Sequence, residues 1–137
     1  MNEAMFDLPD AGFVDHTVTY LPAISPGGRE VLLLLERRPI GEGESFREAV
    51  AEHGRDVAQR YFGYTVIFER EVQVASRPAI DVGARWRADT REEIYTRRTH
   101  LLLGSTRLIV TGEAPLADQD FCDSYVDGVL ATLELRA

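Results

Sequence analysis

The sequence contains a single cysteine, Cys122, and therefore cannot form an internal disulfide. That composition is typical of a protein in a reducing compartment. Lysine is absent: all 15 residues in the Lys and Arg class are arginine, and the net charge is −8. An acidic chain repels phosphate backbones and anionic lipid at long range, which argues against a nucleic acid or a membrane surface as its partner.

Long apolar segments are also missing. The longest strictly apolar run, Val31 to Leu35, has five residues, whereas a membrane-spanning helix needs about 20. The opening residues, Met1 to Asp7, have neither the basic region nor the apolar region of a secretory signal. We therefore expect a cytoplasmic protein that does not insert into a membrane.

Length and composition predict one folded domain over residues 1–137. Hydrophobic residues make up 45% of the chain and charged residues 28%, which is typical of a soluble globular protein. A domain of this length can bury a core without a metal or a disulfide. No repeat, linker or low-complexity segment divides the sequence.

Two amphipathic helices are predicted. Ser45 is a candidate N-cap and Glu48 completes a capping box. The apolar face of this first helix carries Phe46, Val50, His53, Val57 and Tyr61 at spacings of three and four, and Gly63 ends it. The second helix is expected at about 118–132, with Asp118 as its capping residue.

Alternating apolar and polar residues predict antiparallel strands. The expected ranges are about 3–8, 16–21 and 30–38 before the first helix, and 64–74, 80–87, 93–103 and 107–113 after it. In the 64–74 strand the alternation places Tyr64, Val66 and Phe68 on the same face as Val72 and Val74. The order of elements predicts an α+β fold in which helices pack on one antiparallel sheet.

Residues able to do chemistry do not gather in the sequence. His16, His53 and His100 fall on different elements, and no pair of cysteines has metal-ligand spacing. The glycine-rich loop before Ser45 lacks the lysine of a phosphate-binding loop. We therefore expect no catalytic residues, no metal and no cofactor. The basic pair Arg97-Arg98 is expected to pair with Asp81, Glu69 and Glu71 on neighbouring strands; the alternative is that this patch binds an anion.

Several short patterns resemble one known family. They are Phe6-Asp7-Leu8-Pro9-Asp10-Ala11-Gly12-Phe13-Val14-Asp15, Arg29-Glu30, Gly63-Tyr64, Arg77-Pro78-Ala79-Ile80 leading to Trp86, Tyr95-x-Arg97 and Ala114-Pro115. Together they resemble the DcrB-related family over nearly the whole chain. The resemblance implies a PsbP-like α+β sandwich. It also implies a likeness to the cytosolic branch that includes the Eag chaperones of type VI secretion, homodimers that shelter the apolar N-terminal helices of effector proteins.

By this resemblance, the partner-binding groove lies on one face of the sheet and on the inner side of the first helix. Its positions here are Val18, Tyr20, Leu32, Leu34, Glu36, His53, Val57, Tyr61, Ile94, Thr96 and Arg98. Three of them, Glu36, His53 and Arg98, stand where small or neutral side chains are expected, and Glu36 and Arg98 could pair with each other.

Other interpretations of these residues stay open. Most of the eleven positions could simply form the hydrophobic core. The same fold could bind a soluble partner that has no membrane-type helix. A third possibility is a small-ligand pocket or an enzyme that uses Arg97, Arg98 and His100.

Overall fold

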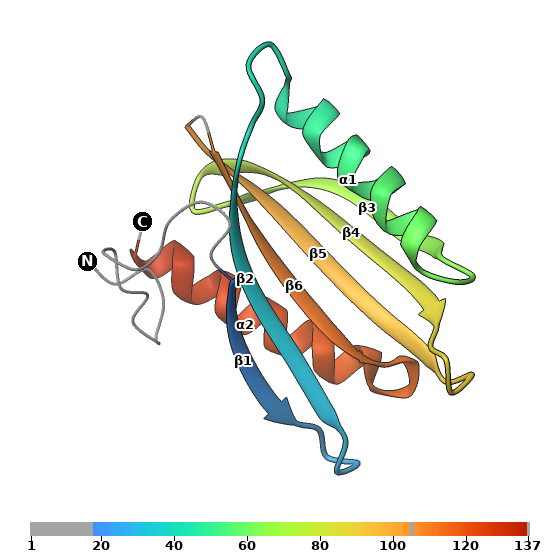
Figure 1. Cartoon of the computed structure of the whole chain (residues 1–137). Coiled ribbons are helices and arrows are strands. Elements are labelled where there is room, and N and C mark those ends of the chain that lie inside the picture. Colours follow the sequence, from blue (N-terminus) through green and yellow to red (C-terminus); the bar gives the residue numbers. More distant parts are fainter. Residues whose placement is uncertain (1–17, 105, 137) are drawn as a thin grey trace.

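The computed structural model describes residues 18–104 and 106–136, with side chains from 22 to 104 and from 106 to 133. This part of the chain forms a six-stranded sheet and two α-helices (Figure 1). The elements are β1 (Val18–Ile24), β2 (Glu30–Pro39), α1 (Phe46–Arg60), β3 (Thr65–Val74), β4 (Arg77–Arg87), β5 (Glu93–Leu103), β6 (Thr106–Pro115), a 3₁₀ turn (Leu116–Asp118) and α2 (Gln119–Arg136).

Every neighbouring pair of strands in the sheet is antiparallel, in the order β1-β2-β6-β5-β4-β3. The strands after α1 form a meander that returns β6 to the centre, beside β2. The predicted α+β class, with helices packed on an antiparallel sheet, is confirmed. The expected strand at 3–8 lies outside the described residues.

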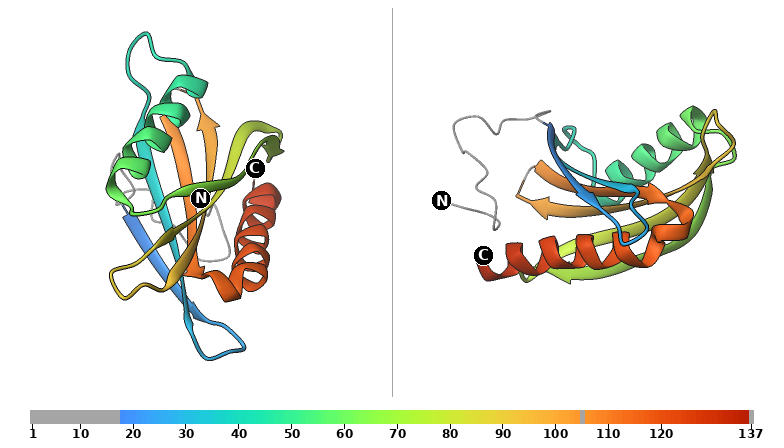
Figure 2. Two further views of the ribbon diagram at one scale, coloured as in Figure 1. Left: turned by 90° about the vertical axis from the view of Figure 1, so that its right-hand side faces the viewer. Right: turned by 90° about the horizontal axis from the view of Figure 1, so that it is seen from below.

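The two helices lie on opposite faces of the twisted sheet (Figure 2). The apolar core lies between α2 and the sheet, because the odd-numbered apolar residues of β2 alternate toward this side. Its fully buried members include Val31, Leu33, Leu35, Tyr95, Leu108, Val110, Cys122, Val126 and Val129. Gly112 lets α2 come close, since a Cβ there would lie 2.5 Å from Val126 Cγ2.

The start of α1 matches the sequence prediction. Ser45 Oγ accepts a hydrogen bond from the Glu48 backbone N–H at 3.1 Å, and the Glu48 side chain accepts one from the Ser45 N–H at 2.8 Å. This reciprocal pair is the expected capping box. Asp118 lies directly before α2, and its carboxylate accepts hydrogen bonds from Arg29 Nε at 2.7 Å and from Arg29 Nη2 at 3.1 Å.

A bulge in β3 corrects the predicted faces of that strand. The register shifts between Val66, which pairs with Ala84, and Phe68, which pairs with Gly83. The extra residue, Ile67, moves Phe68 to the α2 side, where its ring packs over Gly83. Phe68 therefore lies on the opposite face from Val66, not on the same one.

Candidate binding site on the α1 face of the sheet

The predicted groove positions of β2 and β5 lie on the same face of the sheet, the one that α1 partly covers. Directly paired residues of antiparallel strands share a face. Leu34 pairs with Thr111, which in turn pairs with Arg98. In the next row, Leu32 pairs with Glu113 and Glu113 with Thr96. The backbone of Val18 pairs with that of Glu36, and the backbone of Tyr20 with that of Leu34. The side chains of Val18 and Tyr20 lie outside the described part.

Helix α1 covers the half of this face formed by β4 and β5. The His53 ring meets the His100 ring edge-on, with centroids 5.2 Å apart. At the end of the helix, Tyr61 stacks on Trp86 with centroids 4.4 Å apart. Between them Val57 is only 2% exposed. These side-chain contacts hold α1 against the sheet.

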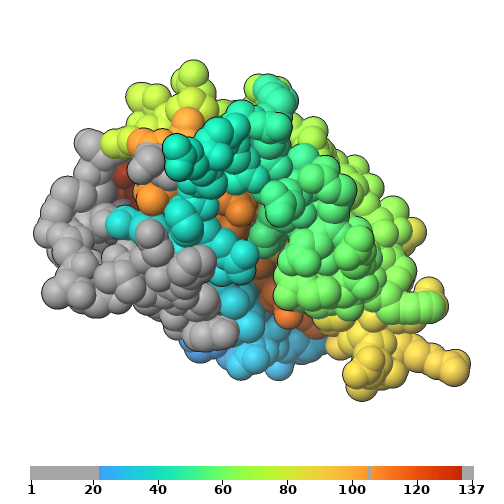
Figure 3. All heavy atoms as spheres, turned by 45° about the horizontal axis from the view of Figure 1, so that its top comes forward, coloured from blue at the N-terminus to red at the C-terminus, as the bar shows by residue number. Residues whose placement is uncertain are grey.

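The half of the face formed by β2 and β6 is less covered. Leu32, Leu34, Thr111 and Glu113 are all partly exposed, although the β2 residues that alternate with them are fully buried. Figure 3 shows atoms of the β5–β6 region, in orange, at the bottom of a depression between β2 and α1. We call this depression, with its walls on β2 and α1 and its floor on β6, the trough.

The predicted positions divide into two groups by exposure. Val57, Thr96, Arg98 and His53 are buried. Leu32, Leu34, Glu36, Tyr61 and Ile94 are partly exposed. Of the described positions, only the second group is exposed enough to contact a helix bound on the outside of the sheet while α1 stays in place.

The charged positions have different partners from those expected. Glu36 Oε2 accepts a hydrogen bond from Arg38 Nε at 2.6 Å, so Glu36 does not pair with Arg98. The guanidinium carbon of Arg98 lies 5.9 Å from the centre of the Tyr61 ring. Burial raises the pKa of the Glu113 carboxyl, and the charge of Arg98 partly opposes that change. A carboxyl group that protonates easily therefore lies on the trough floor.

Both buried histidines are held neutral. Burial lowers the pKa of His53 to about 3, and four arginines act in the same direction: Arg98, Arg107, Arg38 and Arg60. The pKa of His100 is also lowered well below its usual value, again mainly by burial. His100 Nδ1 lies 3.1 Å from Arg107 Nη1, which can only donate, so this nitrogen is the acceptor of a neutral ring.

Sequence reasoning missed the contribution of β6 to this face. Thr111 and Glu113 form the trough floor, between β2 and β5. The signal was present: Arg107, Ile109, Thr111 and Glu113 alternate with apolar or small residues along the strand. The alternation of residues along β6 does not indicate that this strand lies beside β2.

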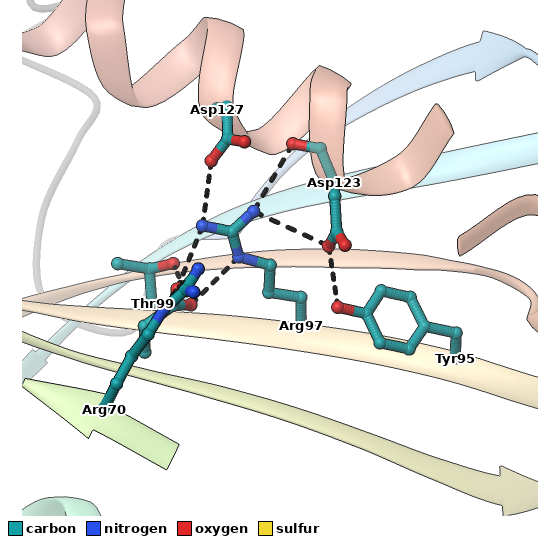
Figure 4. A network of polar contacts seen from close by, with 7 residues as sticks. Arg70, Tyr95, Arg97, Thr99, Asp123 and Asp127 are labelled. Carbon is teal, nitrogen blue, oxygen red and sulfur yellow. Dashed lines mark hydrogen bonds and ion pairs between the residues drawn. The ribbon is translucent and has the colours of Figure 1, made fainter. Parts of the chain in front are cut away.

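Arg97 belongs to the other face, where it forms a network under α2 (Figure 4). Its guanidinium binds the buried carboxylate of Asp81 and lies 2.9 Å from Asp127 Oδ1 on α2. The expected pairing of this arginine with Asp81 is thus confirmed, whereas Glu71 pairs with Arg47 instead. Because Arg97 and Arg98 point to opposite faces, Arg97, Arg98 and His100 do not form one site.

Among the described residues, no group of histidine, cysteine, aspartate or glutamate side chains could hold a metal ion. In the same ranges, neither helix combines the length and apolarity needed to cross a membrane.

The fold and the two-faced sheet define an α+β domain of the PsbP-like class. Among solved structures, the chain is similar to a cyanobacterial PsbP from Synechocystis, with 10% identity, a TM-score of 0.57, and coverage of 82% of this chain and 79% of that one. The family model DcrB matches residues 3–132, and the chain belongs to the DcrB family.

Two more solved structures share the fold. A Pseudomonas aeruginosa protein of unknown function, PA94, described as a candidate regulator, is 17% identical with a TM-score of 0.70, over 88% of this chain and 83% of that one. LpqN of Mycobacterium tuberculosis, described as involved in cell envelope biogenesis, is 10% identical with a TM-score of 0.56, over 80% and 64% of the two chains. No curated protein matches the sequence.

Proposed function

We propose that the chain is a non-catalytic adaptor that binds a helix of another protein in the trough. The specific partner we propose is the apolar N-terminal helix of a type VI secretion effector, kept soluble in the cytoplasm until the effector is loaded, with the adaptor acting as a homodimer. The observation that carries the proposal is the part-exposed pair Leu32 and Leu34 on a face whose other half is closed by α1.

The length of the β2 wall suits a helix. Strand β2 has 10 residues, and at about 3.3 Å per residue it is about 33 Å long. A transmembrane-type helix of about 20 residues has nearly the same length, about 30 Å. Apolar side chains on such a helix would gain free energy by leaving water against Leu32 and Leu34.

Polar groups in the trough restrict the partner further. Glu113 on the floor and the Glu36–Arg38 pair on the β2 wall would be costly against a purely apolar helix. We therefore propose that the bound helix carries at least one hydrogen-bonding side chain that faces Glu113. Membership of the DcrB family and the likeness to a candidate regulator support a binding role.

Co-expression with an effector N-terminal segment tests the proposal. We expect the chain to raise the amount of that segment in the soluble fraction, and Leu34→Asp to abolish the effect. Ile67→Asp is the matched control, since Ile67 is 44% exposed at the β3 bulge, away from the trough. The proposal fails if the segment is equally soluble without the chain, or if the Leu34→Asp variant, folded by circular dichroism, protects it as well as the wild type.

The alternative, a partner that is soluble by itself, is favoured by the same polar groups. It predicts that the partner co-purifies with the chain but stays in the soluble fraction when the chain is absent. The solubility measurement therefore separates the two.

A further inference from the structure

A separate cavity lies under α1 on its β3 side. Its volume is about 480 Å³, within the range of small-molecule sites. Apolar side chains of the helix and of two strands form most of its wall: Val57, Val66 and Val82 line it together with Tyr64. The trough residues Leu32 and Leu34 do not line this cavity, so a ligand here would be distinct from a helix bound there.

Arg98 brings a positive charge to this apolar wall. Its side chain lines the cavity and is 7% exposed. In the described part of the chain no carboxylate forms an ion pair with Arg98, whereas Arg97 on the other face binds Asp81 and Asp127. Tyr64 lines the cavity beside it. Glu113 feels the Arg98 charge, but burial raises the pKa of its carboxyl. It therefore compensates the guanidinium only weakly, and a ligand anion would lower the cost of burying that charge.

His53 supplies a second group for an anion. It lines the cavity, is 8% exposed, and its Nε2 has no hydrogen-bond partner among the described residues. An N–H at this nitrogen could donate to a ligand oxygen. A carboxylate has two oxygens and could accept from Arg98 and His53 together.

The acidic residue Glu69 narrows the class of ligand. It also lines the cavity and is exposed, as is Arg55, so these two opposite charges cancel and Arg98 leaves the lining with one positive charge. An anion with one charge and an apolar body matches the guanidinium and the valine wall. A dianion such as phosphate lacks the apolar body and carries the surplus charge.

We infer that the cavity between α1 and strands β3 to β5 binds a small monocarboxylate with an apolar body. The carboxylate accepts hydrogen bonds from the Arg98 guanidinium and from His53 Nε2, and the apolar body contacts Val57, Val66 and Val82.

Three probes of the same shape test the inference by calorimetry and by amide shifts in ¹H–¹⁵N spectra: cyclohexanecarboxylate, cyclohexylmethanol and cyclohexylmethylamine. Hydrogen bonds to charged groups predict that the carboxylate binds at least about tenfold more tightly than the alcohol. The amine should not bind, and the shifted amides should include those of His53, Val82 and Arg98. Equal affinity for carboxylate and alcohol, or no shift up to the solubility limit, would overturn the inference.

Two variants test whether Arg98 is the positive charge that selects the carboxylate. Arg98→Gln should lose the preference for the carboxylate over the alcohol, while Arg60→Gln, an exposed arginine on α1 that pairs with Asp56, should keep it. A folded Arg98→Gln protein with unchanged preference would also overturn the inference. Should that variant not fold, the comparison of the three probes on the wild type decides by itself. Failure of these probes leaves the co-expression result unaffected, because that assay reads the trough.

Discussion

Asp81 and Arg97 face each other across strands β4 and β5 in a two-pronged ion pair beneath α2. Arg97 Nε and Nη2 donate to the two carboxylate oxygens at 2.9 and 3.0 Å, and the side chains are 4% and 1% exposed. Burial alone would lower the pKa of Arg97, but Asp81 and Asp127 outweigh it and raise that pKa. Arg97 also lies 2.9 Å from Asp127 Oδ1 on α2, so this network joins the sheet to the helix through charged groups.

Removing one member of this pair should be strongly destabilising. Asp81 also accepts hydrogen bonds from Thr99 Oγ1 at 3.0 Å and from Arg70 Nη2 at 2.8 Å. Asp81→Asn leaves the Arg97 charge buried with one carboxylate fewer, so we expect a loss of about 3–5 kcal/mol in the free energy of unfolding, measured with urea. Glu71→Gln, which breaks an exposed pair with Arg47, should change it by about 0.5 kcal/mol or less. Equal losses in the two variants would contradict this prediction.

Acid should weaken the packing of α1 on the sheet. His53 has its pKa lowered to about 3 in the folded state, against 6.5 for an unperturbed histidine. The unfolded chain therefore binds a proton first as pH falls, and stability that is fully present above pH 6.5 is lost progressively down to about pH 3. The expected loss is up to about 1.4 kcal/mol per pH unit for each buried histidine.

The variant His53→Leu separates this effect from other titrations. Glu113, whose pKa is raised, acts with the opposite sign, because the folded protein protonates it more easily than the unfolded one. Urea unfolding at neutral pH and at about pH 5.5 should show a smaller pH dependence in His53→Leu than in the wild type. A pH dependence as large as that of the wild type would mean that His53 is not buried as a neutral ring.

Two glycine-to-alanine changes should act in opposite directions. A Cβ at Gly112 would lie 2.5 Å from Val126 Cγ2 and 2.9 Å from Cys122 Sγ, so Gly112→Ala should cost about 1–3 kcal/mol by forcing α2 away from β6. Gly54 lies inside α1 with no heavy atom within 4 Å of such a Cβ. Gly54→Ala should raise the free energy of unfolding by about 0.5–1 kcal/mol. Thermal or urea unfolding of both variants checks the signs.

The thiol of Cys122 should be unreactive in the folded protein. It is fully buried under α2, and burial raises its pKa to about 12. We expect iodoacetamide to leave it unmodified under native conditions and to alkylate it completely in urea, with mass spectrometry as the readout. Native alkylation at the rate of a free thiol would show that α2 separates readily from β6.

Local signals predicted the elements well because each is written in a few adjacent residues. The Ser45 and Glu48 capping box placed the start of α1, and period-two alternation placed the strands. The alternation failed to predict the bulge at Ile67. Because Val66, Ile67 and Phe68 are all apolar, the pattern fits a strand with Phe68 on either face of the sheet. The packing of Phe68 over Gly83 determines which face Phe68 occupies.

The candidate site could be predicted only in part, since it depends on which strands become neighbours. The resemblance to the DcrB-related family brought Leu32, Leu34 and Arg98 to one face, and the structure places them there. Glu113 was missed because its position follows from β6 lying beside β2, a pairing between segments far apart in the sequence. The Glu36–Arg38 pair shows the reverse: two residues close in sequence satisfied a charge that was expected to need a distant partner.

Strand β3 is an edge of the sheet, and it carries its own protection against growth. Glu69, Arg70 and Glu71 are all exposed along its middle, directly after the bulge at Ile67. Charged side chains and a bulge on an edge strand disfavour the addition of another strand. Charge repulsion and the bulge therefore disfavour an arrangement in which two copies of this chain join their sheets through β3, and they disfavour fibril-like stacking along that border.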